Sequence, residues 1–189
     1  MALKTWAIDT RHSEVRFSLR HLVLARIEGR AELLDGEIRY DRDDPTRSSV
    51  TATIGAATLK TGDVERDGHI ASPEFLDVAR FPEMRFESRE IRPSASGGFD
   101  LLGKLTIRDL TRDVRLHMID QGAYVRPDGV PSEQVGPYAA TGTINRQEFG
   151  LHWNQDLDTG GIVLGDKVEV TLRVEVQARD EARPTLSQA

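Results

Sequence analysis

The sequence contains no cysteine among its 189 residues. Disulfides, thiolate metal ligands and cysteine nucleophiles are therefore excluded. Basic residues are also scarce, because 25 Lys and Arg stand against 31 Asp and Glu, which gives a net charge of -6. A general nucleic-acid-binding protein needs a basic face to engage phosphates, so we expect no nucleic-acid partner.

Long apolar runs are missing as well. No stretch approaches the ~20 residues that cross a bilayer as a helix, so we expect no integral membrane segment. The start of the chain, Met1 to Thr5, shows no apolar core of a signal peptide, and we expect a cytoplasmic protein. The length suits one domain, which we expect over residues 1–178, followed by a polar, disordered tail over residues 179–189.

Period-two alternation of apolar and charged residues dominates the rest of the chain. It is clear from Val15 to Leu19 and clearest in the last segment, from Val168 to Val176. Eight or nine such segments occur, and each has one apolar and one charged face. Strands of this kind need one core and one solvated side, and long strands joined in sequence favour a barrel over a sandwich. We therefore predict an all-β fold, an eight-stranded antiparallel barrel.

A polar segment from Thr61 to Pro82 interrupts the alternation. It places Arg66, Asp67 and His69 within four residues. Ser72 as N-cap and Pro73 at the first helical position predict a short helix, so we expect a helical insertion over about residues 63–80. Binding residues favour loops that a rigid scaffold holds, which makes this insertion a candidate functional region.

The residues expected inside the barrel differ widely in size. Small ones such as Gly29, Gly103 and Gly142 share inward faces with large ones such as Phe17 and Phe86. Either the small residues leave room for a ligand, or small and large side chains interdigitate in a solid core. The pattern leaves both alternatives open.

Two polar residues lie on apolar faces. His21 continues the face of Phe17 and Leu19, and Arg146 continues the face of Ile144. A lone inward histidine is more often a satisfied core residue than a ligand. A buried guanidinium must find a partner, for which Asp67, Glu148 or a ligand anion are the candidates.

Several short motifs, in their order and spacing, resemble those of the YceI-like family, the polyisoprenoid-binding group with a lipocalin-like barrel. The resemblance covers nearly all of the chain from Thr5 to Val176. The matching segments are Trp6–Asp9, His12–Ser13, Thr61–Gly62, Arg66–Ile70, Ser72–Phe75, Phe81–Pro82, Phe86–Ser88, Gly103–Thr111, Asn145–Leu151 and Gly165–Val168.

The resemblance implies a lipocalin-like barrel around a long apolar pocket that holds an isoprenoid chain or another amphiphilic lipid, such as a quinone. It also implies a homodimer. The family's motif positions fall here on His21, Arg66, Asp67, His69, Phe75, Arg146 and Phe149. Two positions depart from the family pattern: Leu76 replaces an aromatic residue and Asp109 replaces a glycine. Many relatives carry a secretion signal, which this chain does not show.

The leading hypothesis is that the protein binds such a lipid as a carrier or store, with no other cofactor and no metal. The channel wall would consist of Phe17, Leu19, Met84, Phe86, Phe99, Leu105 and Trp153. The polar head group would meet Arg66, His69, His21 and Arg146. Arg66 and Asp67 have an alternative and compatible role, a local salt bridge that ties the insertion to the barrel.

The alternative function is an enzyme acting on a hydrophobic substrate in the barrel. His69, oriented by Asp67, would be a general base and His21 a second acid–base group. The sequence shows no nucleophile motif, phosphate-binding loop or metal-ligand spacing in support. A third reading, a partner-binding module, needs an exposed apolar patch that the sequence does not reveal.

Overall fold

The structure is a computed structural model, and it describes residues 4–22, 25–41, 43–121, 137–154, 156–157, 161–162 and 164–178. The strands before the insertion are β1 (Lys4–Ile8), β2 (Glu14–His21), β3 (Ala25–Ala31), β4 (Leu33–Tyr40) and β5 (Ser49–Gly55). The helical segments are η1 (Pro45–Arg47), η2 (Ala56–Thr58), α1 (Val64–Ala71) and η3 (Arg146–Phe149). The later strands are β6 (Glu83–Pro93), β7 (Phe99–Ile107), β8 (Leu110–Asp120), β9 (Tyr138–Asn145), β10 (Asp156–Leu157), β11 (Gly161–Ile162), β12 (Leu164–Val174) and β13 (Val176–Ala178).

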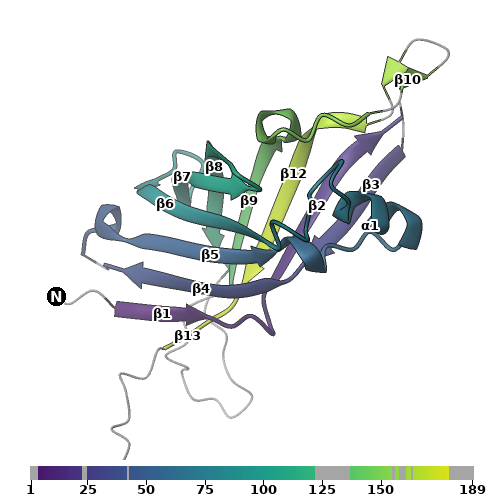
Figure 1. Ribbon diagram of the computed structural model, residues 1–189. Helices are drawn as coiled ribbons and strands as arrows, with labels where there is room; N and C mark the ends of the chain where they lie inside the picture. Colours follow the sequence, from purple (N-terminus) through teal and green to yellow (C-terminus); the bar gives the residue numbers. More distant parts are fainter. Residues whose placement is uncertain are drawn as a thin grey trace, which may run out of the picture.

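Eleven of these strands form one antiparallel sheet in the order β13-β1-β4-β5-β6-β7-β8-β9-β12-β2-β3. The sheet curves into a half-barrel, while β10 and β11 form a separate hairpin (Figure 1). The all-β antiparallel prediction is confirmed, although the strand count exceeds eight. Two alternating runs are each divided by one residue, Glu32 between β3 and β4 and Glu175 between β12 and β13. The short β1 adds a further strand.

The chain just before the insertion pairs with the edge strand β3. Arg30 and Lys60 form an isolated bridge in which each backbone N–H donates to the other's carbonyl at 2.9 Å. Helix α1 then lies beside β2 and β3 (Figure 1). This bridge fastens the beginning of the insertion to the edge of the half-barrel.

The helix lies in the first half of the insertion and not where the sequence placed it. Asp63 is the N-cap, since its carboxylate accepts the Arg66 N–H at 2.9 Å, and Ser72 ends the helix as its C-cap. The prediction of a helix beginning at Ser72 was therefore wrong. Asp63 is as good a capping residue as Ser72. Beyond the helix, the N–H groups of Phe75 and Asp77 both donate to the carbonyl of Ser72, which makes turns of this stretch.

Short turns link several of the strands. The segment 94–98 links β6 to β7, and Arg108, with φ of 56°, lies in the tight turn from β7 to β8. The β4–β5 pair has a register shift between Leu33 and Asp35. The tail expected over residues 179–189 lies outside the described residues.

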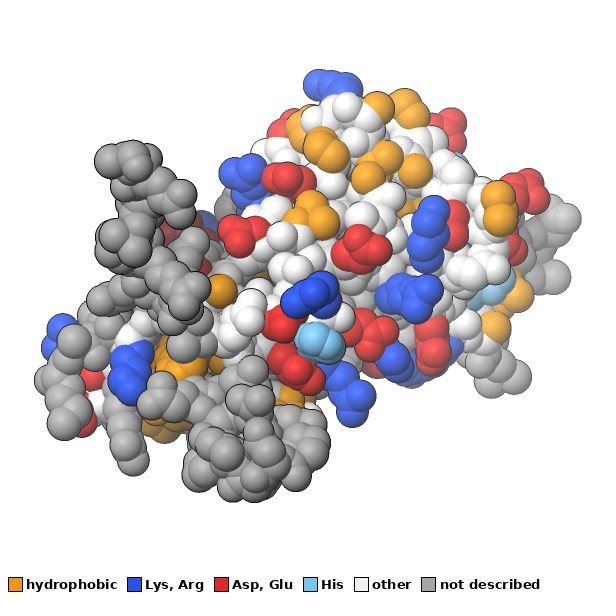
Figure 2. All heavy atoms as spheres, turned by 90° about the horizontal axis from the view of Figure 1, so that it is seen from below, with side chains coloured by type: hydrophobic (Ala, Val, Ile, Leu, Met, Phe, Trp, Pro, Cys, Tyr) orange, Lys and Arg blue, Asp and Glu red, His pale blue; other side chains and the backbone are white. Residues whose placement is uncertain are grey.

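The outward faces of the strands carry the charged residues. Acidic and basic side chains intermingle over the face shown in Figure 2. Many pair with a neighbour two residues along the same strand, as Arg39 does with Glu37 and Arg85 with Glu83. Among the described residues, the exposed large hydrophobic side chains are Leu22, Leu34, Val64 and Ile119. They are spread over different segments of the chain.

Inside the half-barrel, large side chains cover two of the glycines. A Cβ on Gly29 would lie 2.3 Å from the Phe17 ring, and one on Gly103 would lie 2.7 Å from the Phe86 ring. At these two positions aromatic rings occupy the space that a glycine side chain leaves free. This agrees with the alternative in which small and large side chains interdigitate. The interior nevertheless contains cavities, and Gly29 and Gly103 do not provide their volume.

Candidate functional site: a row of apolar cavities

An apolar hollow lies between α1 and the sheet, and we call it the main cavity. It measures about 500 Å³. Apolar side chains from β2, α1, β9 and β12 form most of its wall, among them Leu19, Ile70, Ile144 and Val168. The exposed Asp63 and Glu65 join the wall at the α1 end, which we call the mouth. Water therefore reaches the cavity at one end while its depth is apolar.

Two smaller hollows continue the main cavity toward the other end of the half-barrel. The middle cavity, about 140 Å³, shares Val15, Met84, Ile107, Ile144 and Val170 with the main cavity. The far chamber, about 70 Å³, shares Ile38, Val50, Met118 and Tyr138 with the middle cavity. The shared wall residues place the three hollows in a row, from α1 to the opposite end.

Most of the site residues predicted from the sequence line this row. The main cavity is lined by Phe17, Leu19, His21, Arg66, His69, Phe75, Met84, Arg146 and Trp153. Phe86 and Leu105 line the middle cavity, and Phe99 lines the far chamber. Phe149 lines none of the three, because it is 1% exposed in a separate apolar cluster with Leu76, Ile107 and Leu151.

Sequence reasoning missed the contribution of β9 and β12 to the wall. Val168 and Val170 line the main cavity because β12 pairs with β2, which sets Val168 opposite Leu19 and Val170 opposite Phe17. The alternation of this last strand was the clearest signal in the sequence. It identified an inward face but not which residues that face would meet.

Arg146 lines the main cavity and is almost wholly buried, with 1% of its surface exposed. Its guanidinium has five N–H donors, and hydrogen bonds engage all of them. The acceptors are the carbonyls of Leu151, Trp153, Leu164 and Gly165 and the carboxylate of Asp166. Burial lowers the pKa of Arg146, and Asp166 opposes that shift.

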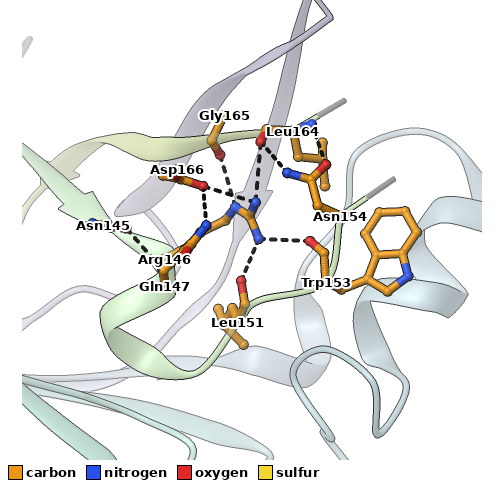
Figure 3. Close-up of polar contacts among 9 residues, drawn as sticks. All are labelled: Asn145, Arg146, Gln147, Leu151, Trp153, Asn154, Leu164, Gly165 and Asp166. Atoms are coloured by element: carbon orange, nitrogen blue, oxygen red, sulfur yellow. Dashed lines mark hydrogen bonds and ion pairs between the residues drawn. The ribbon is translucent and has the colours of Figure 1, made fainter. Parts of the chain in front are cut away.

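The partners of Arg146 differ from those expected. Among the described residues its carboxylate partner is Asp166, at 3.2 Å, and neither Asp67 nor Glu148 pairs with it. The bonds tie η3 and the segment carrying Trp153 to the start of β12 (Figure 3). With every donor engaged, Arg146 positions the wall and has no donor left for a head group.

Arg66 and Asp67 both hold Thr61. The Asp67 carboxylate accepts from the Thr61 N–H at 2.8 Å and from its hydroxyl at 2.6 Å. Arg66 Nε donates to the same hydroxyl at 2.8 Å, and Nη2 donates to the Thr61 carbonyl at 3.2 Å. Thus, within the described part of the chain, the two residues bind Thr61 rather than each other. Thr61 follows Lys60, so this cluster fastens α1 to the bridge at β3.

His69 packs among aromatic rings at the mouth. Its ring centroid is 4.3 Å from that of Trp153, at an interplanar angle of 76°, and 6.3 Å from that of Phe75. Its Nε2 lies 3.3 Å from a carboxylate oxygen of Glu74. Asp67, the orienting partner in the enzyme hypothesis, binds Thr61 instead. The geometry therefore does not assemble the proposed Asp67–His69 pair.

Asp67→Asn should destabilise the protein in a pH-dependent way. The hydrogen bond from the Thr61 hydroxyl, the largest cause, lowers the pKa of Asp67. A carboxylate with a lowered folded-state pKa adds stability above its unfolded pKa of about 3.9 and loses it as the pH falls through the folded value. The difference in unfolding free energy between wild type and variant should thus shrink below about pH 4. Urea denaturation from pH 3 to pH 7 measures it, and a difference independent of pH would contradict this account.

Comparison with known proteins identifies the fold. A family model described as the YceI-like domain matches residues 6–176. The chain belongs to the YceI-like family. A UPF0312 protein of Staphylococcus epidermidis is 30% identical over 167 residues, which cover 88% of this chain and 94% of the relative.

Solved structures of low sequence identity share the YceI-like fold. BcnA of Burkholderia cenocepacia superposes with a TM-score of 0.69 at 21% identity, over 90% of this chain and 99% of that one. A polyisoprenoid binding domain from Saccharophagus degradans gives a TM-score of 0.57 at 11% identity, over 94% of this chain and 100% of that one.

Within the described ranges, no helix combines the length and apolar character needed to cross a bilayer. The same residues hold no group of three or more His, Asp or Glu side chains arranged to bind a metal ion. The site itself is an apolar cavity with a polar mouth.

Proposed function

We propose that this protein binds an isoprenoid chain or a related amphiphilic lipid, such as a quinone, in the row of cavities, as a carrier or store. The observation that carries the proposal is that the main cavity and the wholly apolar middle cavity lie side by side and share five wall residues. A flexible apolar chain suits such a shape, because it can follow the row. Each 100 Å² of ligand surface that it buries contributes about 2.5 kcal/mol.

The likeness to a domain named for polyisoprenoid binding supports the same class of ligand. Membership of the YceI-like family is consistent with it. The homodimer and the cytoplasmic location implied by the sequence stay predictions.

The polar end of the ligand would remain at the mouth. Arg66 lines the main cavity, and its Nη1 contacts no acceptor among the described residues. His69 and His21 line the same cavity. Asp63 and Glu65 stand nearby, so the mouth presents both signs of charge. A charge-assisted hydrogen bond from Arg66 would orient the head group, while the apolar wall would supply most of the affinity.

Lipid extraction tests the proposal. Purified protein should release a chain lipid into organic solvent, identified by mass spectrometry, and native mass spectrometry should show the matching mass difference. Protein stripped of lipid should then bind a fluorescent prenyl probe. Protein that carries no lipid and fails to bind the probe would overturn the proposal.

A further inference from the structure

The far chamber carries polar groups at the end of the row opposite the mouth. Trp6 lines it, from β1 at the end opposite α1, and is 6% exposed. Its indole Nε1 is buried without a hydrogen-bond partner among the described residues. The indole N–H can only donate, and buried donors are nearly always paired in native proteins. An unpaired buried donor on a residue that lines a cavity needs an explanation.

Two phenols join Trp6 in the wall of this chamber, Tyr40 from β4 and Tyr138 from β9. Burial raises the pKa of Tyr138 to about 12, and the nearby charge of Asp120 adds to the shift. The phenol therefore stays protonated and keeps its O–H at neutral pH. Trp6, Tyr40 and Tyr138 together offer neutral donors on three strands.

The size of the chamber limits what can enter it. At about 70 Å³ it is smaller than the adjoining middle cavity. An apolar cavity of about 150 Å³ holds benzene, so a chamber of half that size excludes an aromatic ring. Ile38, Val50 and Met118 contribute apolar atoms to the wall, and Ser48 and Asp120 complete its polar part. A carboxylate or phosphate end would meet the Asp120 carboxylate and no cation among the lining residues, so the chamber disfavours anionic ends.

We infer that the far chamber is a hydrogen-bond-donor site for a small neutral oxygen group, a carbonyl or hydroxyl, at the end of the lipid chain that enters first. This inference rests on the proposed function, because the chain must fill the row to reach the chamber. The protein then binds both ends of its ligand. The head group lies at Arg66 and His69, and the terminal oxygen accepts hydrogen bonds from Trp6, Tyr40 and Tyr138. The implied ligand class is a long-chain lipid oxygenated at its tail.

Matched ligands test this assignment. Two series of long-chain alcohols of increasing length, one ending in methyl and one in a methyl ketone, are compared by displacement of a fluorescent prenyl probe. Wild type should prefer the ketone by roughly 3- to 10-fold, the value of one net hydrogen bond, and only at lengths that reach the chamber. Trp6→Phe keeps an apolar ring, removes the donor and should abolish the preference.

The tryptophans provide an independent readout. The chain has two, Trp6 in the far chamber and Trp153 at the mouth, so Trp153→Phe leaves Trp6 as the sole emitter. Its affinity for the probe is measured first. An alcohol with a terminal bromine should then quench Trp6 emission in Trp153→Phe, and should leave Trp153 emission in Trp6→Phe largely unchanged.

The outcomes separate the two proposals. Equal affinity for both series at every length, or no quenching of Trp6, would overturn the far-chamber site while lipid binding stands. Failure of every chain to bind would overturn the proposed function and this inference with it. If Trp6→Phe does not fold, the double variant Tyr40→Phe and Tyr138→Phe carries the same comparison, because each change removes one hydroxyl and keeps the ring.

Discussion

Val170→Phe should weaken the binding of a long-chain lipid by at least about tenfold, which is about 1.4 kcal/mol. Val170 lines both the main and the middle cavity, so a larger side chain there would block the passage between them. A tenfold loss requires that the ligand gives up only about 55 Å² of buried apolar surface. The ligand would keep its contacts at the mouth and lose those in the depth of the row.

The same substitution should leave the free energy of unfolding within about 1 kcal/mol of wild type, because the added atoms occupy existing space instead of overpacking a filled core. Thr171→Phe is the matched control, since Thr171 is the next residue on β12 and is exposed on the opposite face. Probe titration and urea denaturation of both variants make the comparison. Unchanged affinity in Val170→Phe would mean that the chain does not pass this point.

Arg146→Met should destabilise the protein by about 3–5 kcal/mol, because it leaves carbonyls inside the protein without their donor. Methionine approximates the length of the side chain but offers no donor. The carbonyls of Leu151, Trp153 and Gly165 would then lose the hydrogen bond from Arg146, while that of Leu164 would keep the one from Asn154. An unsatisfied buried acceptor costs about 1–3 kcal/mol, so the loss of these bonds accounts for a destabilisation of at least about 3 kcal/mol.

Arg146→Lys is the informative companion. It keeps the charge beside Asp166 but has three donors on one atom in place of a planar fork, so it should recover only part of the loss. Urea denaturation measures stability, and Trp153 emission reports the segment that Arg146 holds. If Arg146→Met were as stable as wild type but had lost lipid affinity, Arg146 would be a head-group ligand and not a positioning residue.

The two variants have opposite signatures. Val170→Phe should lose ligand and keep stability, whereas Arg146→Met should lose stability first. This contrast follows from one structural difference: Val170 borders empty space, and Arg146 is surrounded by acceptors. Sequence patterns placed Arg146 on an inward face and identified the alternation of Val170, but they could not say which residue bordered a void.

Local signals sometimes competed with one another. Ser72 followed by Pro73 is a sound helix-start signal, yet Asp63 caps the helix and Ser72 ends it. Both residues are good N-caps, and the choice between them depends on contacts beyond the insertion. Arg66 and Asp67 bind Thr61, the residue that follows the bridge between Lys60 and β3. The helix therefore begins directly after that bridge.

By itself the sequence determined the all-β antiparallel class, the inward and outward faces of the strands, the position of the insertion and the family. These properties depend on period-two patterning and on short motifs, which are local. The tertiary structure alone decided the partners of Arg146, the wall contributed by β9 and β12, and the presence of the cavities. Hydrogen-bond partners and voids depend on which residues meet across strands far apart in sequence, and no local pattern records those meetings.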